Sequence, residues 1–391
     1  MADNANPGDE GDQTEVIDPE QNEEVILAAP SAEGSLRYFG VDFDVEGLVR
    51  RFERKELIVP RFDPEEPANS DTGYSGFQRN FVWNKRQMDR FIESVLLGYP
   101  VPGIFLVELK TREYIVLDGQ QRLTTLHGFY HEKVPTPEGY KEGFVLEHVA
   151  DPFKGRSYNT LEPTDQRVLN NALIQATVTL PVGESGKLAI YTLFERINSG
   201  GTQLKEQQIR VAIYPGDATK LVRSLNEDSN WRALFGPRSR DLRDQELILR
   251  YLALKRVAEK IEVEGEDGVA DFKPPMATFI TKFLGENETM EERDLLREAS
   301  EFARACRLLV EACGPDALKR NRTINAARAD SILTGLTLAI RDDPDLTADD
   351  VKIGIDRLES DEDYLSWTQK STSHRASVSG RLVASLLAFS K

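Results

Sequence analysis

Apolar residues in the first half of the chain follow two different periods, which predicts both helices and strands there. From the N-cap candidate Asn84, apolar residues recur at helical spacing, and this predicts a helix that ends where Gly-Tyr-Pro interrupts it at 98–100. Two β-type runs follow at 104–109 and 114–117, separated by four polar residues, so we expect a hairpin or a paired edge. After a turn at 118–119 the apolar spacing becomes helical again.

Further segments complete this mixed region. A helical stripe covers 42–55, a short strand at 57–60 ends at a proline, and the segment 63–76 is expected to be a loop. A β-type run at 174–180 precedes a helix over about 186–197. A glycine-containing turn then leads into another helix that starts near Gln203.

Beyond residue 214 the pattern is helical almost throughout. The expected helices are 217–225, 244–257, 275–284, 291–313 and 331–341, and an acidic glycine-containing loop at 262–268 interrupts them. The predicted fold class is therefore α+β, with a small mixed domain over 36–215 and a mainly helical domain over 216–391.

Residues 1–35 differ in composition from everything that follows. They hold ten acidic residues and no Lys or Arg, and they are poor in bulky apolar residues, so we expect a disordered acidic tail. The net charge of the whole chain is -17, but the chain without this tail carries 56 acidic against 49 basic residues. A broad nucleic-acid-coating surface is therefore not expected, whereas a local basic groove remains compatible with the sequence.

The overall composition is that of an ordinary soluble protein. The hydrophobic fraction is 40%, the charged fraction is 29%, and no apolar run approaches the ~20 residues that a membrane helix needs. The first residues show no basic and apolar secretory signal, so we expect a cytoplasmic location and no membrane partner. Cys306 and Cys313 lie about two turns apart on one predicted helix, too far apart to bridge, and are expected to be reduced core residues.

The stretch 114–126 carries the most informative chemistry, because it predicts a buried strand, a tight turn and the start of a helix. Free backbone N–H groups and the positive end of the helix dipole can hold an anion at such a turn. The turn holds a glycine, a carboxylate, two amides and the guanidinium of Arg122. The alternative is that Arg122 only pairs with Asp118 or with solvent.

Four motifs occur in an order that resembles a known family. They are FQRNFVW at 77–83, SVLLGYPVP at 94–102, DGQQR at 118–122 and FERINSGG at 194–201. In this order they resemble the GmrS-type N-terminal domain family of GmrSD restriction systems, which has a ParB/sulfiredoxin-like fold. The resemblance covers roughly residues 45–215 and reaches only thinly into the helical part.

The resemblance implies an NTP site at 118–122, of unknown nucleotide preference, with Mg²⁺ as a candidate metal. Asp118, Gln121 and Arg122 are the implied catalytic residues: Asp118 would hold a metal or water and Arg122 would neutralise phosphate. Gly119 and Gln120 would cradle phosphate. The family's QR pair matches Gln78 and Arg79, which would lie across the same cleft, and we expect Trp83 to pack beneath that loop rather than to stack on a base.

A second set of residues gives weaker signals. Arg196 and Asn198 end a helix at a glycine turn and are either nucleotide ligands or part of a corner that supports the cleft. His127 and His131 share one helical face, but no third ligand is recognisable nearby, so no metal site is expected. The basic stretch 319–322 with Arg328 either faces DNA or lies at a solvated helix start.

The preferred hypothesis is an NTP-binding and hydrolysing sensor subunit of a modification-dependent restriction or phage-defence system. It would act on DNA, modified or not, and a separate HNH-type nuclease or other defence protein would cleave, because the four histidines form no HNH arrangement. One alternative is a non-catalytic DNA-binding or assembly module with a ParB-like fold. Another is that the helical half binds a protein partner, while the acidic tail mimics DNA or blocks the cleft.

Overall fold

A computed structural model describes most of the chain beyond residue 35. The described residues are 16–17, 36–59, 81–108, 113–136, 139–183, 206–239, 241–264, 269–320 and 323–390, with single residues between 186 and 197. The chain forms two compact units, of which one comprises Ala29–Asp63 with Tyr74–Lys205 and the other comprises Glu206–Lys391 with Met1–Ala28 and Pro64–Gly73.

The first unit is built on a five-stranded sheet in the order β2-β8-β4-β5-β3. Its strands are β2 (Leu36–Asp44), β3 (Leu57–Ile58), β4 (Ile104–Glu108), β5 (Tyr114–Asp118) and β8 (Leu173–Pro181). The long strand β2 pairs antiparallel with β8 along its whole length. Strand β4 pairs parallel with β8 and antiparallel with β5, and β5 pairs parallel with β3. The sheet is therefore mixed, and the expected hairpin of β4 and β5 is confirmed.

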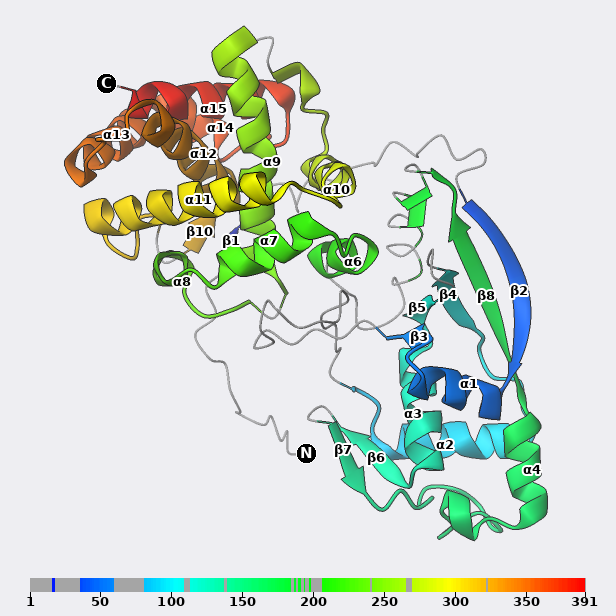
Figure 1. The fold of residues 1–391 in the computed structure, drawn as a ribbon. Coiled ribbons are helices and arrows are strands. Elements are labelled where there is room, and N and C mark those ends of the chain that lie inside the picture. Colours follow the sequence, from blue (N-terminus) through cyan, green and yellow to red (C-terminus); the bar gives the residue numbers. More distant parts are fainter. Residues whose placement is uncertain are drawn as a thin grey trace. The chain divides into compact units, whose positions relative to one another are not determined.

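Four helices pack against one another beside this sheet (Figure 1). They are α1 (Val45–Glu53), α2 (Lys85–Leu96), α3 (Gln120–Tyr130) and α4 (Pro163–Asn171), and a small hairpin of β6 (Lys133–Thr136) and β7 (Gly139–Glu142) follows α3. Helix α2 begins as predicted, because Asn84 and Gln87 form a capping box in which each side chain bonds the other's backbone N–H. The core between helices and sheet includes Leu48, Ile92, Leu106, Val116, Leu126, Phe129 and Ile174.

The helix that was expected over 42–55 begins later than predicted. Residues 36–44 are strand β2, and helix α1 starts at Val45, where the side chain of Asp44 accepts a hydrogen bond from the N–H of Gly47. Most β2 side chains are exposed, Tyr38 among them at 77%, so the strand lacks the buried apolar alternation that would have identified it.

The second unit is mainly helical. Its helices are α6 (Glu206–Ile213), α7 (Asp217–Asn226), α8 (Ser229–Phe235), α9 (Arg243–Glu264), α10 (Met276–Glu286), α11 (Glu292–Cys313), α12 (Ala326–Asp342), α13 (Ala348–Ser360), α14 (Glu362–Trp367) and α15 (Arg375–Phe389). Helix α12 packs against α9, α11 and α15, and its residues from Ala326 to Ile340 are all buried. It is thus the central helix of this unit.

A small sheet adds to the helical unit and recruits the beginning of the chain. Strand β10 (Thr323–Asn325) pairs antiparallel with β9 (Lys319–Arg320) and parallel with β1 (Val16–Ile17). Two residues of the segment expected to be disordered are therefore strand partners of the helical unit. None of the helices in the described part of the chain is both long enough and apolar enough to cross a bilayer.

Candidate functional site

The predicted motif forms the junction between strand β5 and helix α3. Asp118 is the last residue of β5 and its side chain is 50% exposed, whereas Gly119 is buried and is the N-cap of α3. Gly119 has φ +104°, and a Cβ added there would lie 2.3 Å from Cγ2 of Ile104. Only glycine fits this turn without strain, and it brings the backbone close against the sheet.

The guanidinium of Arg122 is held at the mouth of this turn. Its Nη2 donates to the carboxylate of Asp118 and to the backbone carbonyl of Gly103, at 2.8 Å each. The Arg122 side chain is only 13% exposed. The pairing of Arg122 with Asp118, which the sequence left as an alternative to a ligand role, is therefore present, and it brings both side chains to the same point.

Two buried N–H donors of the motif lack acceptors among the described residues. Gln121 accepts through Oε1 from the N–H groups of Val82 and Trp83, at 3.2 and 3.4 Å, but its Nε2 has no partner. Nε of Arg122 also has none. A buried donor without an acceptor costs about 1–3 kcal/mol, so this site can gain from an incoming acceptor such as a phosphate oxygen.

The N-terminus of α3 offers backbone donors at the same place. No side chain in the described part of the chain caps it, and its first turn contains no acidic residue. The first N–H groups of a helix have no intrahelical acceptor and lie at the positive end of the helix dipole. Gln120, the first helical residue, is partly buried here. The turn therefore has the elements of an anion site, which are free helix N–H groups, a glycine that lets an anion come close to the backbone, and a guanidinium.

The other predicted ligands are Gln78, Arg79, Arg196 and Asn198, and all four lie outside the described residues. The last residues of the motif at 77–83 do contact the motif at 118–122, because the backbone N–H groups of Val82 and Trp83 donate to Gln121. Trp83 packs edge-on against Phe91 of α2, with ring centroids 5.5 Å apart.

A buried carboxylate that sequence reasoning missed fixes α2 to the segment 144–150. Asp89 is fully buried and accepts from the N–H groups of Glu147 and His148 and from Nδ1 of His148, and it pairs with Lys85. Lys85 also donates to the carbonyl of Val145. An aspartate among apolar helical positions was the only signal in the sequence, and it did not identify partners some sixty positions away.

In the helical unit, Arg328 is a structural residue. It is 6% exposed and donates to the carbonyl of Ala317 and to the carboxylate of Glu359. Lys319 pairs with Asp316. This excludes Arg328 from the DNA-facing alternative that the sequence had left open.

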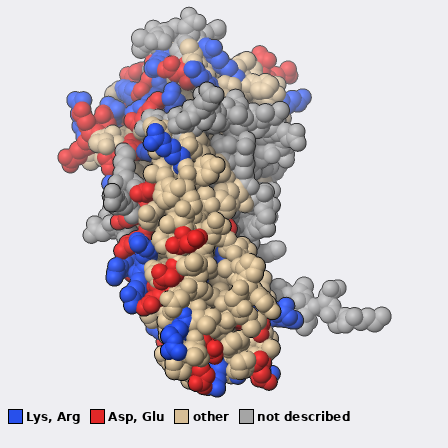
Figure 2. All heavy atoms as spheres, turned by 90° about the vertical axis from the view of Figure 1, so that its right-hand side faces the viewer, with Lys and Arg blue, Asp and Glu red and all other residues tan. Residues whose placement is uncertain are grey.

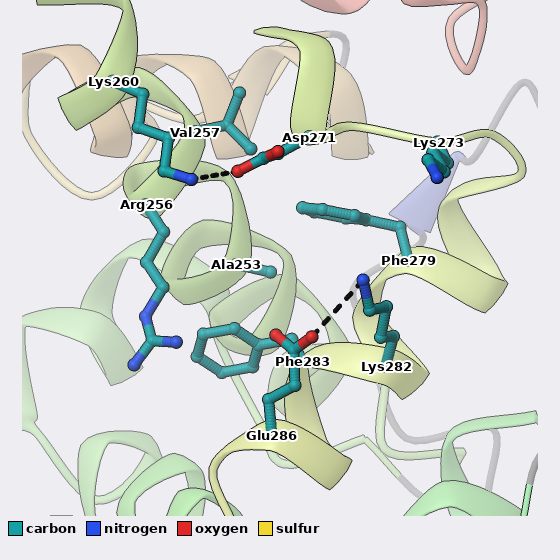
Figure 3. A pocket seen from close by; sticks show the side chains of 10 residues that line it. All are labelled: Ala253, Arg256, Val257, Lys260, Asp271, Lys273, Phe279, Lys282, Phe283 and Glu286. Atoms are coloured by element: carbon teal, nitrogen blue, oxygen red, sulfur yellow. Dashed lines mark hydrogen bonds and ion pairs between the residues drawn. The ribbon is translucent and has the colours of Figure 1, made fainter. Parts of the chain in front are cut away.

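The helical unit also contains a pocket that the sequence did not indicate (Figure 3). It lies along α9 and α10, has a volume of about 320 Å³, and is lined in part by Phe279 and Phe283. Four basic and two acidic side chains line it. At its lining, Lys260 pairs with Asp271, and Lys282 pairs with Glu286 one turn along α10, so acidic partners offset part of the positive charge of the pocket.

Charges on the face shown in Figure 2 are mixed. Lys and Arg side chains of the described residues lie among Asp and Glu side chains, and a broad area in the middle of the view carries few charges. The described residues therefore form no continuous basic surface on this face, on which a duplex could neutralise its phosphates.

Comparison with protein families gives one match, which covers the site. Residues 74–215 match the family described as the N-terminal domain of the GmrSD restriction endonuclease. This segment belongs to the GmrSD N-terminal domain family. Neither the curated proteins nor the solved structures gave a match to the chain.

The GmrSD N-terminal segment does not coincide with either compact unit, because residues 74–205 belong to the first unit and residues 206–215 to the helical one. The matched residues include α2, β4, β5, α3 and β8, and thus the complete motif at 118–122. Strands β2 and β3 and helix α1 lie before residue 74, although β2 and β3 form the two edges of the same sheet. The family match thus covers the centre of the sheet and the site, while both edges come from outside it.

Proposed function

We propose that this chain is an NTP-binding and hydrolysing subunit of a restriction or phage-defence system, and that residues 118–122 bind the nucleotide phosphates. The observation that carries this proposal is the pair of buried donors, Nε2 of Gln121 and Nε of Arg122, which have no acceptor among the described residues and lie beside the N-terminus of α3, which no described side chain caps. A phosphate oxygen is the acceptor that suits all of these donors.

The roles of the residues follow from their positions. Gly119 allows the phosphate close to the backbone, and the N–H groups of Gln120 and Gln121 point from the helix start. Arg122 neutralises the phosphate charge and exchanges Asp118 for the nucleotide as its partner. The half-exposed carboxylate of Asp118 is then free to bind a Mg²⁺ ion or the attacking water. Gln78 and Arg79, with Arg196 and Asn198, are proposed as further ligands from the sequence alone.

The proposed partners are DNA, modified or not, and a separate HNH-type nuclease or other defence protein. This rests on the membership of residues 74–215 in a restriction-endonuclease family and on the sequence, in which the histidines form no HNH arrangement. In this proposal the subunit senses DNA and couples it to nucleotide turnover, while another polypeptide cuts.

The test is binding and turnover of ATP, GTP, CTP and UTP by the full chain with Mg²⁺, with and without DNA. We expect at least one nucleotide to bind and Arg122→Ala to weaken it by roughly 10-fold or more, the loss of one charge-assisted contact. Arg167→Ala, an exposed arginine on α4, is the matched control and should bind like the parent protein. If no nucleotide binds, or if both variants bind equally, the proposal is wrong.

The ion pair between Arg122 and Asp118 supports a second candidate, a DNA-binding or assembly module without catalysis, in which this pair keeps the site closed. The two candidates differ in how DNA binding depends on nucleotide. In an electrophoretic mobility assay, the non-catalytic module shifts DNA equally with and without NTP. The NTP-dependent sensor shifts DNA only when nucleotide is present.

A further inference from the structure

A cluster of three potential metal ligands lies at the opposite end of α3 from the nucleotide motif. Glu53, the last residue of α1, meets His127 and His131, which lie one turn apart at the end of α3. One ligand atom from each residue lies within 4.8 Å of the other two. Helices α1 and α3 pack against each other in the same unit (Figure 1), so the cluster joins two neighbouring elements.

We propose that Glu53, His127 and His131 form a binding site for one divalent transition-metal ion of the Zn²⁺ type. Two imidazoles and one carboxylate are the donor set that such ions take, whereas Mg²⁺ and Ca²⁺ prefer oxygen ligands throughout. Three protein ligands leave at least one coordination position for water or another molecule, as in open zinc sites.

The distances require only a small movement of side chains. Nε2 of His131 lies 2.6 Å from Oε1 of Glu53, and the rings of His127 and His131 lie 4.6 Å apart between centroids. Bonds of about 2.0–2.1 Å in a tetrahedral site place neighbouring ligand atoms about 3.3 Å apart. The His131 and Glu53 atoms therefore have to separate slightly to admit an ion, and the ligand atom of His127 lies within 4.8 Å of both.

Neighbouring groups orient the imidazole of His127 and favour a bound cation. Nδ1 of His127 lies 3.2 Å from the hydroxyl of Tyr140, and Phe52 packs edge-on against the imidazole. A metal-binding histidine usually bonds such a second group through its other ring nitrogen, which here leaves Nε2 for the ion. Helices α1 and α3 both end at the cluster, so the negative ends of two helix dipoles face the ion.

Access and competition also suit a metal. The side chains of His131 and Glu53 are 44% and 38% exposed, so an ion can enter from solvent. Among the described residues, Glu53 forms an ion pair only with His131. The neighbouring Arg54 pairs with Glu56 instead. The carboxylate is thus not held by a competing arginine.

The ion is distinct from any Mg²⁺ that would accompany a nucleotide. A helix rises about 1.5 Å per residue, so His131 lies roughly 13 Å along the axis of α3 from Arg122. The consequence is mechanical: the ion would fasten α3, which begins with the motif, to α1. This inference stands on its own observations and is independent of the nucleotide proposal.

The experiment measures Zn²⁺ and Co²⁺ binding by the chelator-stripped full chain, by competition with a chromophoric chelator and by the ligand-field absorption of Co²⁺. We expect one ion per chain, no displacement by excess Mg²⁺, and a rise in the thermal midpoint with Zn²⁺. His131→Asn and Glu53→Gln should each weaken binding by about 100-fold or more, since even groups behind the ligands contribute roughly 10–100-fold.

His374→Asn is the matched control, because it removes an exposed imidazole from the other unit. It should bind Zn²⁺ like the parent protein. Circular dichroism checks that each variant is folded, and the exposed positions of His131 and Glu53 make both substitutions tolerable. A chain that binds no Zn²⁺, or binds it equally in the His131→Asn and His374→Asn variants, overturns the proposal.

Discussion

Arg122 donates from Nη2 to the carboxylate of Asp118, one helical turn earlier in the chain, at 2.8 Å. The two side chains differ in environment, since Arg122 is 13% and Asp118 is 50% exposed. Exposure of the carboxylate keeps the stability gain from this ion pair small, in the range of about 0–1 kcal/mol. Because breaking this pair costs little stability, a large loss of activity on substitution of Asp118 would indicate a functional role for the motif and not a structural one.

We expect Asp118→Asn to lower NTP turnover strongly while the free energy of unfolding falls by less than about 1 kcal/mol. The physical reason is that the amide cannot bind a metal or orient water as a carboxylate does. Glu46→Gln breaks a similar exposed i,i+4 pair with Arg50 and is the control. Turnover that Asp118→Asn leaves unchanged would assign the pair a purely structural role.

Replacement of Gly119 should destabilise the fold through two separable effects. Gly119→Ala introduces strain at φ +104° and a contact of 2.3 Å with Ile104. Gly143→Ala adds only the first effect, because Gly143 has φ +91° and no atom lies within 4 Å of its added Cβ. In urea unfolding we expect the alanine at 119 to cost about 1–3 kcal/mol more than the alanine at 143. Equal costs would mean that β4 yields to the new side chain.

Asp89→Ala should cost about 3–5 kcal/mol of unfolding free energy, because it leaves Lys85 and two backbone N–H groups without their buried acceptor. Glu311→Ala, which breaks an exposed i,i+4 pair with Arg307, should cost less than about 0.5 kcal/mol. Urea unfolding of both variants measures the difference. Similar losses in the two would show that segment 144–150 rearranges without the carboxylate.

The helical unit should lose stability in acid through Glu301. Burial raises the pKa of this carboxyl, but hydrogen bonds from Arg341 and Lys255 outweigh it and leave the pKa below its usual value. Because the folded pKa is the lower one, the stabilisation is complete above the unfolded pKa of about 4.3 and is lost as the pH falls through the folded value. Glu301→Gln should therefore be less stable at pH 7 and show a weaker decline in stability as the pH falls below the unfolded pKa. A decline of unchanged steepness would argue against this assignment.

The sequence predicted those parts of the fold whose cause is local. Helix α2 has a cap and an apolar stripe within one stretch, and the turn at Asp118-Gly119 marks the end of β5 and the start of α3. The ion pair of Asp118 with Arg122 was also foreseeable, because an i,i+4 spacing at a helix start brings such residues together. Local periodicity and capping thus explain the elements that carry the motif.

Relationships between distant segments could not be read from the sequence. Strand β2 is recognisable only through its pairing with β8, which lies far along the chain, since its own side chains are mostly exposed. Glu53 joins His127 and His131 only because α1 packs against α3. In both cases the packing of the folded chain, and not any local period, determines which residues meet.

The pairing of β1 with β10 means that the first residues of the chain are part of the unit built by the last ones. A C-terminal fragment that starts at residue 206 would lack this strand and leave one edge of β10 uncovered. Removal of residues 1–35, intended only to take away acidic charge, would have the same effect. Dissection of this protein therefore has to preserve Val16–Ile17, or supply the segment as a separate peptide, before a change in DNA affinity can be ascribed to charge.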